Sequence, residues 1–119
     1  MTGVQTCALP ISEGRVTGEA RRLFLDMNAI ALRSPPIGSN LDVAPAFHRL
    51  GAISVPSLVI WGDLDFPHIQ ERCRHIAMTM PNGSGHMLTG IAHLPSLERP
   101  AEITNLVAAF TDGCSGQRA

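Results

Sequence analysis

The sequence predicts an α/β protein with two parallel strands and flanking helices, and three observations support this. An almost continuous apolar run from Ile53 to Trp61 is typical of a parallel strand that is covered on both faces. An amphipathic segment that begins at Pro67 follows it, and a shorter run from His86 to Thr89 comes next. Strand, helix and strand in this order form a right-handed crossover, in which the two strands lie parallel.

Composition narrows the class of protein. The chain has 119 residues, of which 45% are hydrophobic and 16% charged, with a net charge of -1. Its basic residues are all arginines scattered among the acids, so no basic stripe is available for a phosphate backbone. No apolar run approaches the roughly 20 residues of a membrane-spanning helix, and the given sequence does not start with a charged segment followed by an apolar one. We expect a soluble, cytoplasmic protein that binds neither nucleic acid nor membrane.

The cysteines indicate no special chemistry. Cys7, Cys73 and Cys114 are odd in number and lack the spacing of a metal or redox motif. We interpret them as free thiols, and we expect no metal site.

Residues 1–12 are set aside from the fold argument. The segment from Met1 to Ile11 resembles the translation of a sequencing-library adapter, with Met1 arising from a GTG start codon. It is therefore treated as an expression tag would be. This interpretation makes the chain a fragment whose natural N-terminus is missing; the alternative is an ordinary flexible N-terminus.

Residues 13–40 are expected to form a helix and a linker. Between Gly18 and Arg33 the apolar residues recur at spacings of three and four, which predicts an amphipathic helix; they are Ala20, Leu23, Phe24, Met27, Ile30 and Ala31. Pro35 and Pro36 then end the helix, because a residue before proline is disfavoured in the α conformation. The stretch from Ser34 to Asn40 is predicted to be a linker.

The helix of the crossover is predicted to begin at Pro67, a residue that suits the first helical turn. Its apolar positions face the sheet, namely Ile69, Cys73, Ile76, Ala77 and Met80. His68 and His75 flank that face and are expected to be exposed. The residues from Met80 to Gly85 are turn formers, and they place His86 at the entrance of the second strand.

A final helix is predicted from Pro100. Its core-facing stripe consists of Ile103, Leu106, Val107 and Phe110, and it is expected to end near Asp112 and Gly113. Residues 113–119 are predicted to be a disordered tail.

Two side chains with catalytic potential follow the two predicted strands. Asp65 lies in the turn after the first strand, and His93 follows the second. The carboxyl ends of neighbouring parallel strands lie at the same edge of a sheet. We therefore expect a carboxylate and an imidazole to meet at this edge.

Two motifs resemble the C-terminal part of an α/β-hydrolase-fold enzyme. They are I-x-V-P-x-L-V-I-x-G-D-x-D, which runs from Ile53 to Asp65, and A-H-L-P-S-L-E-R-P, which runs from Ala92 to Pro100. The resemblance covers residues 41–112, and it implies that the preceding helix, within residues 13–40, belongs to a cap region or to its return into the core. A plain core helix is the alternative. The resemblance also implies that the segment from Leu41 to Gly51 leads the chain into the sheet, with Phe47 and Leu50 packed beneath it.

The resemblance implies a role for each of the two residues. In such enzymes a nucleophile attacks a carbonyl, a histidine moves the proton, and a carboxylate orients the histidine. Asp65 matches the acid and His93 the general base, and no cofactor is expected. Asp63 is the alternative acid. Two carboxylates in one turn repel each other, so we expect Asp63 to face solvent or to accept backbone N–H groups.

The nucleophile is absent from the sequence. A nucleophilic serine in this fold needs Gly-x-Ser-x-Gly between a strand and a helix. The glycine-flanked Ser84 has the wrong spacing, and Ser115 lies beyond the last helix with Gln117 where a glycine is needed. We expect the fragment to be inactive alone, and the nucleophile to lie upstream.

Three functional interpretations stay open at this point. The first is a hydrolase that acts on a small-molecule ester, lactone or C–C bond. The second is a dehalogenase-like or epoxide-hydrolase-like relative with an aspartate nucleophile. The third is a protein of the same fold that binds or interacts without catalysis.

Overall fold

The computed structural model describes residues 13–35 and 45–116. The adapter-like segment 1–12, residues 36–44 and residues 117–119 lie outside the described residues, and so do the predictions made for them.

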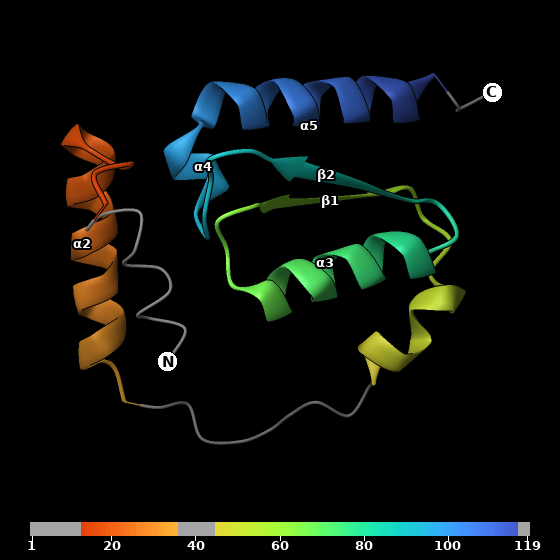
Figure 1. The fold of residues 1–119 in the computed structure, drawn as a ribbon, viewed down its shortest axis with the longest axis horizontal. Coiled ribbons are helices and arrows are strands. Elements are labelled where there is room, and N and C mark those ends of the chain that lie inside the picture. The colour runs from red at the N-terminus through yellow and green to blue at the C-terminus, as the bar shows by residue number, and fades with distance from the viewer. Residues whose placement is uncertain (1–12, 36–44, 117–119) are drawn as a thin grey trace.

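A two-stranded parallel sheet forms the centre of the fold (Figure 1). β1 (Ser57–Gly62) pairs with β2 (Gly83–Leu88), and the register runs from Ser57 opposite Gly83 to Gly62 opposite Leu88. Helix α3 (Pro67–Thr79) connects the two strands. The predicted α/β class, with two parallel strands and flanking helices, is confirmed.

Helices α3 and α5 lie on opposite sides of the sheet (Figure 1). α5 (Pro100–Ser115) follows a single turn of helix, α4 (Pro95–Glu98). The most deeply buried hydrophobic side chains are Val16, Leu88, Ile91 and Ala92, and the last three lie at the end of β2 and in the loop that follows it. The first residues of β1, Ser57 to Ile60, are only half-buried. The packed core therefore lies directly beneath the loops that carry Asp65 and His93.

β1 begins at Ser57, not at Ile53 as predicted. Ile53 instead ends the 3₁₀ helix η1 (Ala46–Ala52), where its N–H donates to the Leu50 carbonyl at 3.1 Å. Pro56, directly before the strand, has no N–H to donate to a neighbouring strand. Pairing therefore begins only at Ser57. Local hydrogen bonding thus competes with the apolar pattern that predicted a longer strand.

η1 matches the expected lead into the sheet only in part. Leu50 is buried, as expected, but Phe47 is 46% exposed. The Phe47 ring lies against His75 of α3, with centroids 5.2 Å apart. The prediction that Phe47 packs beneath the sheet is wrong.

β2 begins at Gly83, so the glycines assigned to a turn belong to the strand. A Cβ atom on Gly83 would lie 2.5 Å from the Ala77 carbonyl oxygen, and one on Gly85 would lie 3.0 Å from the Trp61 ring. The glycines permit the strand to approach α3 and Trp61 closely. His86 is consequently opposite Ile60 within the strand, rather than at its entrance.

The outer helices differ from the predictions at different points. α2 (Gly18–Arg33) has the predicted bounds, yet none of its residues is buried, and Met27 and Ile30 of its apolar stripe are 60% and 65% exposed. α5 continues to Ser115, so Gly113 to Ser115 are helical and not part of a tail. Among the described residues, no helix is long and apolar enough to cross a membrane.

Candidate active site

Asp65 and His93 are in hydrogen-bonding contact. Asp65 lies in the turn between β1 and α3, and His93 lies in the loop between β2 and α4. The His93 Nδ1 atom is 2.8 Å from Asp65 Oδ2. The prediction that the loops after the two strands bring a carboxylate and an imidazole together at one edge of the sheet is therefore confirmed for their contact. Their catalytic roles remain a prediction.

The two partners of this pair have different environments. The Asp65 side chain is 4% exposed, whereas that of His93 is 31% exposed. The second carboxylate oxygen of Asp65 accepts the Phe66 N–H at 2.8 Å. The acid is thus held in place within the protein, while the imidazole reaches the surface.

The contact determines the state of the imidazole ring. An ionised carboxylate only accepts hydrogen bonds, so the Nδ1 atom of His93 must carry the shared proton. In the neutral ring this leaves a lone pair on Nε2. No described residue is bonded to Nε2, which can therefore accept a proton from a molecule at the surface. This is the arrangement that a general base requires.

Asp63 accepts a backbone N–H group, as expected for the alternative acid. Its carboxylate receives the Gly90 N–H at 2.7 Å. Gly90 has a φ of 76°, which favours glycine because other residues rarely adopt this conformation. Asp63 thus ties the turn after β1 to the loop after β2, and Asp65 alone contacts the histidine.

Gln70 was not singled out from the sequence, yet it holds the acidic turn. From the first turns of α3, its side-chain amide donates to the carbonyls of Asp63 and Asp65 at 2.9 and 2.7 Å. In the sequence, Gln70 is one of several polar residues on an amphipathic helix. Nothing in that pattern separates it from a solvated side chain.

Glu98, which belongs to the motif from Ala92 to Pro100, holds the backbone around His93. Its carboxylate accepts the N–H groups of Ala92 and Leu94, at 3.1 and 3.0 Å, and the Arg15 Nε–H at 2.7 Å. The only sequence signal was an acidic residue five positions after His93. A charged residue in a short helical turn is usually solvated, so the pattern alone could not indicate burial.

Cys73 of α3 lies near the Asp65 carboxylate. Burial raises the pKa of its thiol, and the negative charge of Asp65 raises it further, while Arg74 acts in the opposite direction. Cys73 is half-buried and makes no disulfide. A raised pKa keeps the thiol protonated, which argues against a nucleophilic role.

The serines rejected as nucleophiles lie away from His93. Ser84 is the second residue of β2, about 13 Å along the strand from Leu88 at ~3.3 Å per residue. Its hydroxyl donates to the Ser57 carbonyl at 3.3 Å. Ser115 lies in the last turn of α5, and its hydroxyl donates to the Thr111 carbonyl at 3.0 Å.

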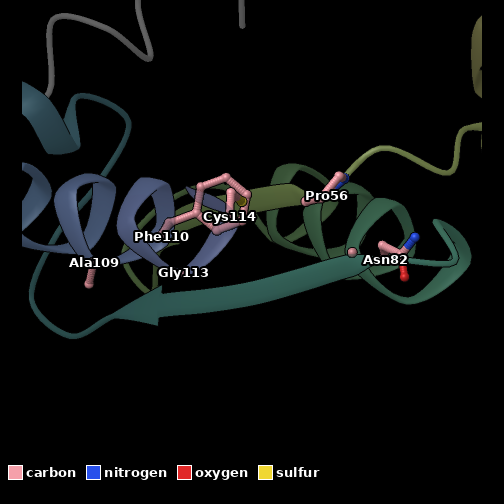
Figure 2. A pocket seen from close by; sticks show the side chains of 7 residues that line it. Pro56, Asn82, Ala109, Phe110, Gly113 and Cys114 are labelled. Carbon is pink, nitrogen blue, oxygen red and sulfur yellow. The ribbon is translucent and has the colours of Figure 1, made fainter. Parts of the chain in front are cut away.

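A cavity of about 470 Å³ lies at the far end of the sheet from the Asp65–His93 pair. Figure 2 shows Phe110 and Cys114 of α5 facing this space, with Pro56 before β1 and Asn82 before β2 at its other side. Because these residues lie at the strands' amino ends, the cavity is not the pocket that His93 would serve.

Comparisons with known proteins agree with the resemblance of the two motifs. The chain is 34% identical over 76 residues to epoxide hydrolase EphH of Mycobacterium tuberculosis. The match covers 60% of this chain and 35% of the relative, so the chain spans about a third of that protein's length. No family model matches the chain, and no solved structure matches it significantly. The match and the motifs together support a relationship to the α/β hydrolases.

Proposed function

We propose that this chain supplies the acid and the general base of an α/β-hydrolase active site that acts on a small molecule. Asp65 is the acid and His93 the base. The observation that carries the proposal is the 2.8 Å contact between a buried carboxylate and an imidazole that reaches the surface. The nucleophile belongs to polypeptide outside this sequence, and neither a cofactor nor a metal takes part.

The chemistry of the pair follows from its geometry. With a serine nucleophile, His93 Nε2 takes the hydroxyl proton and passes it to the leaving group, while Asp65 stabilises the intervening imidazolium and keeps the ring oriented. An aspartate nucleophile attacks as a carboxylate and has no proton to give. The same base then activates a water molecule, which hydrolyses the covalent intermediate. This second step is common to serine and aspartate nucleophiles, so the pair suits both.

Two substrate classes follow from the two possible nucleophiles. The ending around His93 resembles enol-lactonase-like and carboxylesterase-like enzymes, which favours an ester or lactone and a serine. The similarity to an epoxide hydrolase favours an epoxide and an aspartate. The residue at the upstream strand-to-helix turn distinguishes the two. A cytoplasmic location remains part of the proposal.

Kinetics on the longer protein that contains this chain test the proposal. Activated esters, lactones and epoxides are the substrates, and His93→Ala and Asp65→Asn are the variants. We expect kcat to fall by roughly 10⁴-fold or more in each, as for members of a catalytic triad. His86→Ala is the matched control, because His86 is exposed on β2 away from the pair, and its kcat should be unchanged.

A non-catalytic binding protein gives a different result. Such a protein turns over none of these substrates, and its ligand affinity survives His93→Ala. That outcome contradicts the proposal.

A further inference from the structure

The carboxylate of Glu98 is buried beneath the loop that carries His93. Its side chain is 2% exposed. One oxygen accepts the Leu94 N–H at 3.0 Å, and both oxygens lie within 3.1 to 3.3 Å of the Ala92 nitrogen. Ala92 and Leu94 are the immediate neighbours of His93. The carboxylate therefore holds the backbone on both sides of the histidine.

A buried carboxylate is stable only with charged or hydrogen-bonding partners. Arg15, from the segment before α2, provides one through its Nε–H, at 2.7 Å from Glu98 Oε1. The two backbone N–H groups provide the rest. Each oxygen of Glu98 therefore has a partner, and its position is fixed by three donors, one from the segment before α2 and two from the loop that carries His93.

Capping of α4 explains only part of this arrangement. Leu94 is the N-cap residue of α4, and acceptance of its N–H by a side chain of the following turn is a common way to satisfy a helix end. Ala92 lies two residues before the N-cap residue and needs no such cap. The bond from the Ala92 N–H instead fixes the backbone on the other side of His93. The same loop is also held by the Gly90 N–H, which donates to Asp63 at 2.7 Å.

We propose that Glu98 is a positioning residue for His93. It fixes the backbone on both sides of the histidine, and so holds Nδ1 in contact with Asp65 and directs Nε2 outward. This inference rests on the proposed function, because positioning has a purpose only if His93 acts as a base. Arg15 neutralises the buried charge, and so links the segment before α2 to the site.

Amide hydrogen exchange of this chain is the first test, and it needs no variant. We expect the Ala92 and Leu94 amides to exchange at least about 10-fold more slowly than the His93 amide, after correction for intrinsic rates. The described residues offer no acceptor to the His93 N–H. Equally fast exchange at all three amides overturns the proposal.

Glu98→Gln is the second test, with Glu102→Gln as the matched control. The glutamine has the same shape, but an NH₂ group replaces one of the two carboxylate oxygens. This group is a donor, so it cannot accept the hydrogen bonds that the replaced oxygen accepted. Glu102 is a partly exposed acid of α5 paired with Arg99, so its replacement should leave the loop unchanged. ¹⁵N spectra of the imidazole rings report whether the His93 Nδ1 proton is retained.

The expected result is specific to Glu98. In Glu98→Gln the His93 Nδ1–H signal is lost or mixed with the other tautomer, and protection of Ala92 and Leu94 falls, while Glu102→Gln resembles the wild type. Circular dichroism shows whether each variant stays folded. A folded Glu98→Gln variant with an unchanged His93 spectrum overturns the proposal. None of these measurements requires catalysis, so loss of the proposed function would be seen separately, in the His93→Ala kinetics.

Discussion

Gly62 is the position at which a single methyl group should do most damage to the site. It ends β1 where the Ile91–Ala92 backbone crosses, and a Cβ atom there would lie 1.9 Å from the Ile91 carbonyl oxygen and 2.6 Å from that of Ala92. Ordinary contact begins at 3.4 Å, so Gly62→Ala must separate the strand from the loop by about 1.5 Å, the difference between these distances. The atoms that clash are backbone, so no side chain can rotate away.

This displacement should break two hydrogen bonds. The Leu64 N–H donates to the Ile91 carbonyl at 2.9 Å, and His93 contacts Asp65 at 2.8 Å. A shift of this size takes both beyond the reach of a hydrogen bond, about 3.5 Å. Overpacking costs about 1–3 kcal/mol and each of the two lost bonds about 1 kcal/mol, so Gly62→Ala should lower the free energy of unfolding by about 3–5 kcal/mol.

Urea unfolding followed by circular dichroism measures this loss. Gly113→Ala in α5 is the control, because a Cβ atom there meets nothing within 4 Å. Removing a glycine from a helix interior should stabilise the control by roughly 0.5–1 kcal/mol. If Gly62→Ala unfolds at the same urea concentration as the wild type, the close crossing of strand and loop is wrong.

Three further predictions concern the surroundings of the pair. The alkylation rate of Cys73 should rise at a higher pH than that of an ordinary thiol, because burial and the Asp65 charge raise the pKa of Cys73. Asp65→Asn removes that charge, so the pH profile of the rate should move to lower pH. An unchanged profile contradicts the proximity of Cys73 to Asp65. Gln70→Leu should lower the free energy of unfolding by about 1–3 kcal/mol, since two turn carbonyls lose their donor, and unchanged urea unfolding argues against that role. The chain alone should not hydrolyse activated esters, and an activity abolished by Ser84→Ala or Ser115→Ala would contradict the assignment of the nucleophile elsewhere.

The sequence was sufficient for the order of the elements and for the meeting of Asp65 and His93. The apolar run that ends at Trp61 and the crossover helix from Pro67 are strong local signals. Together they require that the loops after the two strands share an edge. The contact needed no knowledge of side-chain packing, because topology alone brings the two loops together.

The element ends were less predictable, because they depend on contacts between distant segments. Gly83 and Gly85 are turn formers in isolation, and only their approach to Ala77 and Trp61 accounts for their place in a strand. Phe47 is apolar, yet its position places it against His75 at the surface. Local composition carries no information about these neighbours.

The residues that support the site could not be recognised for a similar reason. Gln70 and Glu98 act through backbone groups, which every residue has, so no complementary residue type marks their partners in the sequence. The Arg15–Glu98 pair joins residues 83 positions apart. Such pairing depends on how the segment before α2 packs, which hydrophobic periodicity does not predict.

The tautomer of His93 tests the central claim most directly. The ¹⁵N spectrum of the imidazole rings, recorded at mildly alkaline pH, should show the His93 proton on Nδ1, exchanging slowly with water, and Asp65→Asn should remove this signal. The exposed His86 provides the internal reference for an unbonded ring. If His93 has the same spectrum as His86 and does not respond to Asp65→Asn, the acid and the base are not a pair.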